Sequence, residues 1–402
     1  MRPDPARFGA PSPAAAGSAT RPVVAVGLVA LAVAMGIGRF AFTPLMPLMI
    51  RDGSLSAVSG AEWAAANYVG YLVGALTASR FADDPRRGLR LGLLGVALTT
   101  LAMAGLGSVP NPRLTILAGA GLRAAAGVFS AWALVCASGW CLAQLARRRA
   151  EGMGAWIYTG VGLGIALAGI LAWLGGRQSA DRLWLELGMI AAAGALLVRG
   201  LSRGLSGNEG PPRVSVASVG RRSGQGGPVF CYGAFGFGYI VPATFLPAMA
   251  RDLAPDPLVF GLAWPLFGLA AALSVAGAAR WLARAPRRRV WAAAQGLMAL
   301  GTALPLFVHA LWAVAAAAIL VGGTFMVATM AGLQWAREAQ PEDPTSLLAR
   351  MTAAFAAGQI AGPLLVRALG LLDIADAAAL AWTGAAATVV LVGTAFQLWR
   401  EA

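Results

Sequence analysis

The 402-residue sequence contains no lysine, one histidine and only three cysteines. Without lysine, any chemistry through a lysine Schiff base is excluded, and the lone His309 cannot build a metal cluster. Cys136, Cys141 and Cys231 all lie in apolar stretches, so we expect buried small hydrophobic residues and no disulfide framework. Charged residues make up only 12% of the chain, against roughly a quarter in soluble domains. An ordinary soluble protein is therefore excluded.

Apolar sequence takes the place of the missing charge. Hydrophobic residues make up 58% of the chain, and the mean hydropathy is +0.70. They occur in blocks of about 20 residues, the length of helix that crosses a hydrocarbon core about 30 Å thick. Helices are expected because a backbone in lipid must satisfy its own hydrogen bonds. The sequence predicts an all-α membrane protein with twelve transmembrane helices, at 22–50, 59–80, 88–108, 113–146, 152–175, 182–201, 228–250, 258–281, 289–308, 310–337, 346–370 and 374–398.

Two polar segments divide the chain. Residues 1–21 are rich in Pro, Ala and Gly and predict a disordered N-terminal tail, followed by an uncleaved first span. Residues 202–227 are rich in Gly, Ser, Pro and Arg, as in a flexible cytoplasmic linker. This linker separates an N-terminal six-helix bundle, 22–201, from a C-terminal six-helix bundle, 228–402.

The net charge of +14 comes entirely from arginine, and its placement predicts the orientation. With both termini in the cytoplasm, 23 of the 31 arginines lie on the inner side and six on the outer side. This bias follows the positive-inside rule and predicts a multi-pass protein of the cytoplasmic (inner) membrane with both ends inside. It also explains the basic charge through the lipid bilayer, without a nucleic-acid partner.

An internal repeat relates the two predicted bundles. The first and seventh spans match at an offset of 200 residues, and the fifth and eleventh share a pair of glycines four residues apart. The first match aligns Gly36, Gly38, Pro47, Arg51 and Asp52 with Gly236, Gly238, Pro247, Arg251 and Asp252. The second aligns Gly160 and Gly164 with Gly358 and Gly362. Two parallel six-span repeats joined by a linker are typical of the major facilitator superfamily.

Three segments resemble the YbfB/YjiJ-like branch of that superfamily: GIGRFAFTPLMP at 36–47, NYVGYLVG at 67–74 and GQIAGP at 358–363. The resemblance covers nearly the whole chain beyond the tail and implies the major facilitator fold and a transport role. The branch has no common substrate to carry over. The loop after the second span departs from the superfamily pattern, because Ala78 stands where an aspartate is usual. Arg123, with Gly127 four residues on, resembles a fourth-helix pattern associated with proton coupling.

Two arginines lie within predicted spans. An arginine as deep as Arg39 costs about 2.5–3.5 kcal/mol to insert, so it should face the bundle interior or a water-filled cavity. The superfamily architecture places Arg123 on the same central cavity. Together they would favour an organic anion as ligand. The alternatives are a structural arginine bonded to backbone carbonyls and, for Arg123, a side chain that reaches the interface.

Further candidates are uncharged. The predicted substrate-binding set comprises Arg39, Asn67, Tyr71, Arg123, Tyr158, Tyr239 and Gln359, where each polar side chain could instead hydrogen-bond in helix packing. Tyr239 stands at the position equivalent to Arg39 in the second half. The predicted coupling and gating set comprises Arg123, Gly36, Gly38, Gly160, Gly164, Gly358 and Gly362, where the glycines could instead serve close packing. No span has a carboxylate at its middle, so coupling should go through Arg123 or the substrate itself.

The predicted function is a secondary active transporter that moves a small molecule by alternating access, with protons as the coupling ion. An organic anion is the favoured substrate, and we expect a monomer with no metal or other cofactor. The alternatives are an efflux permease for non-anionic substrates and a non-transporting sensor on a transporter fold. A membrane-embedded enzyme is disfavoured because its usual clusters of Asp, Glu, His or Lys are missing; the acidic pairs Asp83–Asp84 and Glu342–Asp343 lie in arginine-rich loops.

Overall fold

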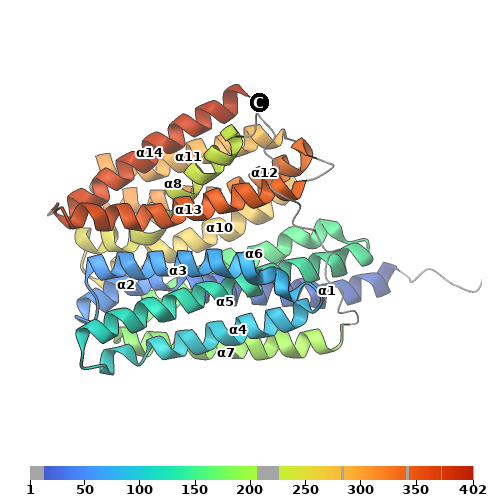
Figure 1. Cartoon of the computed structure of the whole chain (residues 1–402), viewed down its shortest axis with the longest axis horizontal. Coiled ribbons are helices and arrows are strands. Elements are labelled where there is room, and N and C mark those ends of the chain that lie inside the picture. The colour runs from blue at the N-terminus through green and yellow to red at the C-terminus, as the bar shows by residue number, and fades with distance from the viewer. Residues whose placement is uncertain (1–12, 206–225, 282–284, 341–343, 373, 402) are drawn as a thin grey trace, which may run out of the picture.

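The computed structural model describes residues 13–205, 226–281, 285–340, 344–372 and 374–401, and within these ranges it contains helices and no strands (Figure 1). The first rod joins three helical segments end to end. The first half consists of α1 (Pro13–Leu31), η2 (Ala32–Phe40), α2 (Phe42–Arg51), α3 (Ala57–Thr77), α4 (Pro85–Met103), α5 (Pro112–Arg147), α6 (Gly154–Leu174) and α7 (Ala180–Arg203). The second half consists of α8 (Gly226–Leu253), α9 (Pro257–Phe260), α10 (Ala263–Trp281), α11 (Arg287–Phe307), α12 (Leu311–Ala339), α13 (Pro344–Gly370) and α14 (Asp376–Arg400). Short 3₁₀ turns lie at η3 (Ala78–Phe81), η4 (Leu106–Ser108) and η5 (Glu151–Met153).

The helices match the predicted spans and confirm the all-α membrane class. Ten helical rods of the described chain are long and apolar enough to cross a membrane. The two remaining long helices, α3 and α4, are more polar because α3 carries Asn67 and two tyrosines and α4 begins with a cluster of arginines. Their place in the bundle is that of the predicted second and third spans.

Two boundaries differ from those expected. The first helix begins at Pro13, so residues 13–21, which we assigned to a disordered tail, are helical. Alanine is frequent over this stretch, and it is the residue with the highest helix propensity. The predicted linker, 202–227, overlaps the flanking helices, because residues 202–203 belong to α7 and residues 226–227 to α8. Most of it, 206–225, lies outside the described residues, as do 1–12 of the tail.

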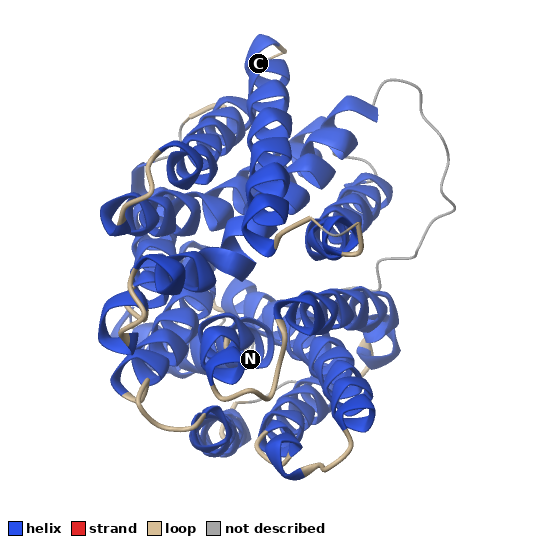
Figure 2. Cartoon of the chain, turned by 90° about the vertical axis from the view of Figure 1, so that its left-hand side faces the viewer, coloured by secondary structure: helices blue, strands red, loops and turns tan. Residues whose placement is uncertain are grey.

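The two halves lie one above the other in Figure 1, and Figure 2 shows the bundle from one end. We call the end at which α1 begins and α14 ends the N-terminal face, and the opposite end the distal face. The halves touch mainly through α6 against α10, α3 against α13 and α2 against α8. The Oγ1 of Thr43 donates a hydrogen bond of 3.1 Å to the carbonyl of Ala243. These positions are 200 residues apart, so the pseudo-twofold axis relating the repeats passes beside them.

The glycines of the repeat lie at close helix contacts. A Cβ atom on Gly36 would collide with the backbone of Gly164, and one on Gly160 with the carbonyl of Leu28. In the second half, a Cβ on Gly358 would collide with the carbonyl of Gly233. A Cβ on Gly38 or Gly362 would meet side chains instead, those of Ser130 and Ile240 respectively. Close backbone approach through small residues therefore joins the fifth span to the first and the eleventh to the seventh.

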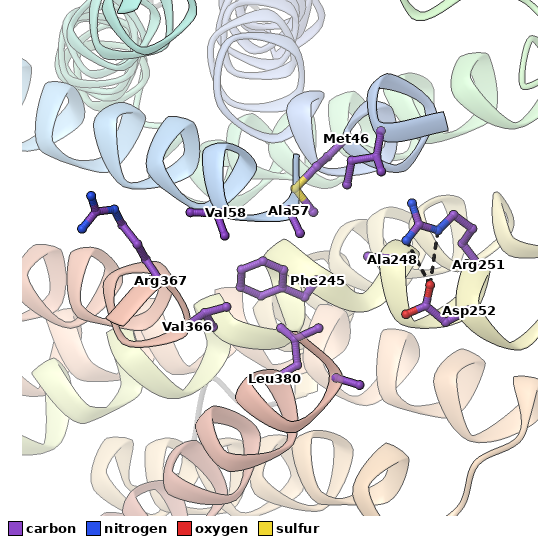
Figure 3. A pocket seen from close by; sticks show the side chains of 12 residues that line it. Met46, Ala57, Val58, Phe245, Ala248, Arg251, Asp252, Val366, Arg367 and Leu380 are labelled. Atoms are coloured by element: carbon purple, nitrogen blue, oxygen red, sulfur yellow. Dashed lines mark hydrogen bonds and ion pairs between the residues drawn. The ribbon is translucent and has the colours of Figure 1, made fainter. Parts of the chain in front are cut away.

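The halves are closed against each other at the distal face. Glu62 of α3 and Arg367 of α13 form an ion pair of 2.5 Å between the halves. Beside it lies a cavity of about 70 Å³, into which Phe245 projects, with Arg367 on one side and the Arg251–Asp252 ion pair on the other (Figure 3). A space of this size holds a few water molecules and no substrate. From this end the ribbons of α3 and α13 diverge towards the N-terminal face (Figure 1).

Candidate functional site

The first rod changes its helical winding at the middle of the molecule. The nine residues Ala32–Phe40 form a π-helix, and all but the first are buried. π-helical segments are rare and occur frequently at functional sites. Pro44 follows shortly after. Because proline has no N–H, Pro44 in the first turn of α2 offers no donor to the carbonyls at the junction between the π-helix and α2.

Arg123 of α5 supplies the missing donor. Its Nη2 donates to the carbonyl of Arg39 at 2.8 Å and its Nη1 to the carbonyl of Gly38 at 3.2 Å. Its guanidinium also lies 4.9 Å from the ring centre of Phe42. Asn67 of α3 donates to the carbonyl of Arg123 at 2.8 Å, which ties the three helices together. In this conformation Arg123 and Asn67 hold the backbone of the π-helix, which matches the structural alternative stated for each.

Arg39 is held differently. Its side chain is buried, with 3% of the residue exposed, yet its Nε and Nη2 have no hydrogen-bond partner. The guanidinium carbon lies 4.1 Å from the ring centre of Tyr71, 5.2 Å from that of Tyr68 and 5.3 Å from that of Phe40. No ion pair of the described chain includes Arg39. It is thus a buried cation packed against aromatic faces, with two of its three guanidinium nitrogens unpaired.

The second half contributes an aromatic layer opposite Arg39. Tyr239 stacks between Phe325, at 5.5 Å and 6°, and Phe355, at 5.6 Å and 8°. Its hydroxyl accepts a hydrogen bond from the Nε2 of Gln359, whose Oε1 is buried without a partner. Tyr239 therefore presents neither ring face to the space between the halves. Its position equivalent to Arg39 suggested a side chain that faces the cavity and gave no sign of this enclosure.

Contacts across the halves bring the two layers together. The Tyr68 and Thr244 hydroxyls are 3.0 Å apart, and Phe40 packs against Phe325 at 6.3 Å between ring centres. Tyr158 of α6 is half-buried. We call Arg39, Tyr68, Tyr71, Thr244 and Gln359 the Arg39 layer. The predicted substrate-binding set missed Tyr68 and Thr244, and sequence reasoning missed the π-helix, for which Pro44 was the one local signal.

The acidic residues lie away from this layer. Glu62 pairs with Arg367 across the halves, and Glu186 pairs with Arg182 at 3.5 Å within α7. Asp84 accepts from the backbone N–H of Arg87 and caps α4. The uncompensated positive charge at the centre of the described bundle is therefore that of Arg39 and Arg123.

A two-repeat, all-helical membrane bundle with a buried polar layer between its halves is the architecture of a major facilitator transporter. The family model described as "Uncharacterised MFS-type transporter YbfB" matches residues 31–396, and the chain belongs to this family. No curated protein matches the chain.

Several solved structures share the fold. The D-xylose-proton symporter superposes with a TM-score of 0.71 at 14% identity, over 94% of this chain and 96% of that chain. A single-residue mutant of the nucleoside transporter NupG superposes with a TM-score of 0.67 at 14% identity, over 94% and 99%. The human organic anion transporter MFSD10 (TETRAN) superposes with a TM-score of 0.60 at 17% identity, over 94% and 99%. At these identities the likeness establishes the fold alone.

Proposed function

We propose that this protein is a proton-coupled secondary transporter of small organic anions, and that the anion binds Arg39. The observation that carries the proposal is the pair of buried, unpartnered N–H groups on Arg39. Nε and Nη2 share one edge of the guanidinium, the edge that binds a carboxylate or phosphate through two parallel hydrogen bonds. An anion there would also neutralise a charge that is expensive to bury alone.

The rest of the layer suits an organic anion. Tyr71 and Tyr68 provide apolar ring surface beside the cation, and the partnerless Oε1 of Gln359 can accept a hydrogen bond from the ligand. We assign Asn67 and Arg123 to positioning, because their donors already hold the backbone carbonyls around the π-helix. Tyr158 and Tyr239 flank the site, the first on α6 and the second within the aromatic stack.

Alternating access follows from the contacts between the halves. The ion pair of Glu62 with Arg367 joins the halves at the distal face, and on this ground we propose access from the N-terminal face. From the arginine bias we infer that this face lies in the cytoplasm and that the chain lies in the inner membrane. We further propose that the protein acts as a monomer. The described spans have no carboxylate at their middle, so we assign the coupled proton to the substrate, which would cross in protonated form or with a proton.

The test is a ligand screen followed by flux. Small organic anions, cations and sugars are added to the purified protein, and the melting temperature is recorded. Anions should stabilise it, and the same anion should enter proteoliposomes under a proton gradient. Arg39→Gln should weaken anion binding by roughly ten- to hundredfold, since hydrogen bonds to charged groups contribute about 1.5–3 kcal/mol. Arg39→Lys should fall between, because lysine keeps the charge and loses the paired geometry.

Arg113→Gln is the matched control, because Arg113 is exposed and lies at the start of α5, at the distal face, whereas Arg39 lies at the middle of the bundle. It should bind and transport like the wild type. Unchanged anion affinity in well-folded Arg39→Gln would refute the proposed site. Stabilisation by cations or sugars only would support the efflux alternative, and binding without flux the sensor.

A further inference from the structure

A second basic site lies at the N-terminal face of the first half, remote from the Arg39 layer. A cavity of about 410 Å³ opens between α4, α5 and α7. Four arginines and one carboxylate line it: Arg86 and Arg90 of α4, Arg199 and Arg203 of α7, and Asp84. The side chains around this cavity therefore carry a large positive excess, which attracts an anionic group.

One of these arginines is fixed in place. The Nη2 of Arg86 donates to the carbonyl of Ser202 at 2.7 Å and to that of Leu205, which satisfies carbonyls at the end of α7. Its guanidinium lies 5.0 Å from the ring centre of Trp140. Its Nε is buried and has no hydrogen-bond partner. The Nε–H of Arg86 is thus available to a ligand, while the other contacts of Arg86 fix the orientation of its guanidinium.

The surface next to the cavity changes from charged to apolar along both helices. On α4, Arg86 and Arg90 continue at four-residue spacing to Leu94, which is 52% exposed. On α7, which packs against α4 and runs the other way, Arg203 and Arg199 lead to Leu196, which is 68% exposed. Residues three or four apart lie on one helix face. Both helices, seen at the lower edge of the bundle in Figure 1, therefore turn from arginine to exposed leucine away from the N-terminal face.

We propose that this cavity binds a phosphate group, carried by an anionic membrane lipid. Arginine presents planar paired donors that match phosphate oxygens. The exposed leucines continue the site into the region of the acyl chains, where a free phosphate would find no partner. Basic pockets between membrane helices on the cytoplasmic side are suited to such headgroups. The site is independent of the proposed transport of anions at Arg39.

The test compares lipids and phosphate on the detergent-purified full chain. Phosphatidylglycerol should raise the melting temperature in a saturable way, and zwitterionic phosphatidylcholine should do so only weakly. In the double variant Arg199→Gln/Arg203→Gln, the half-saturating concentration of phosphatidylglycerol should rise by about tenfold or more. These two side chains are exposed and hold no carbonyl, so the fold should persist. Arg199→Lys/Arg203→Lys should keep most of the affinity.

The control pair is Arg337→Gln/Arg400→Gln, which removes the same charge from exposed positions at the same face of the second half. An equal loss of affinity for phosphatidylglycerol in this control would show that the effect comes from general surface charge, and would overturn the site. Unchanged affinity in Arg199→Gln/Arg203→Gln would overturn it as well. If inorganic phosphate alone gives the full stabilisation in the wild type and not in that variant, the phosphate site stands and its lipid origin is overturned.

Discussion

The two buried arginines should respond to neutralisation in different ways. Both are 3% exposed, and both lie against aromatic rings. Replacing either with glutamine relieves a similar burial penalty, about 2.5–3.5 kcal/mol on insertion scales, and loses cation–π contacts of about 0.5–2 kcal/mol. The burial penalty cancels between the two variants, but Arg39 has three ring contacts and Arg123 has one, which narrows the difference in stability. What remains is the pair of hydrogen bonds that Arg123 alone donates to the carbonyls of Gly38 and Arg39.

The size of this difference in stability depends on how much a hydrogen bond between membrane helices contributes. A hydrogen bond between membrane helices contributes about 0.6 kcal/mol on average and at most about 1.7 kcal/mol. After the additional ring contacts of Arg39 are subtracted, we expect Arg123→Gln to be less stable than Arg39→Gln by up to about 2 kcal/mol. Arg39→Gln itself should be as stable as the wild type or more so, since its buried charge has no hydrogen-bonded compensation at Nε or Nη2.

The assay is reversible unfolding in mixed micelles, followed by helical circular dichroism, with hydrogen exchange of Gly36–Phe40 as a local readout. Arg123→Gln should speed exchange in the π-helix and Arg39→Gln should leave it unchanged. An Arg39→Gln variant that is as unstable as Arg123→Gln would refute the reasoning, because it would show Arg39 to be a structural member of the same network. Loss of anion binding without loss of stability is the expected signature of Arg39.

Two further perturbations probe the movement and packing of the halves. Glu62→Gln removes the ion pair at the distal face. At half-exposed sites such a pair contributes up to about 1 kcal/mol, so the population of the conformation that is open at the distal face should rise by up to about fivefold. The distance between spin labels at Arg113→Cys and Leu371→Cys measures this population. An unchanged distance distribution would exclude the pair as a lock. Gly160→Ala should destabilise the bundle by about 1–3 kcal/mol, since the new methyl would meet the carbonyl of Leu28. Gly121→Ala, which meets nothing within 4 Å, should be neutral or slightly stabilising in the same thermal assay; equal losses in both would contradict the packing argument.

The local chemistry of the chain accounts for most of the architecture. Span length, the 200-residue repeat and the shared glycines are properties of short stretches, and each predicted a feature of the helices. The burial of Arg39 was also local, because an arginine in the middle of an apolar span has few alternatives. The start of the first helix was less predictable, since an alanine-rich segment serves equally well as a tail or a helix.

The roles of Arg39 and Arg123 depend on contacts with other helices. Arg123 donates to the carbonyls of Arg39 and Gly38, which lie 84 and 85 residues away in sequence. Nothing in the sequence of α5 indicates that the π-helix leaves these carbonyls free to accept. The repeat aligned Tyr239 with Arg39, but the enclosure of Tyr239 depends on Phe325 and Phe355 from two other helices.

The sequence by itself determined an all-helical membrane protein of two repeated halves with a deep arginine in the first span, because hydrophobic length and charge depth act within one helix. Only the tertiary structure decided that Arg123 donates its hydrogen bonds to backbone carbonyls, while one edge of the Arg39 guanidinium stays unpaired between the halves. It also brought the arginine stripes of α4 and α7 together around one cavity. Hydrogen-bond satisfaction is a property of neighbours in space, and these neighbours come from helices far apart in the chain.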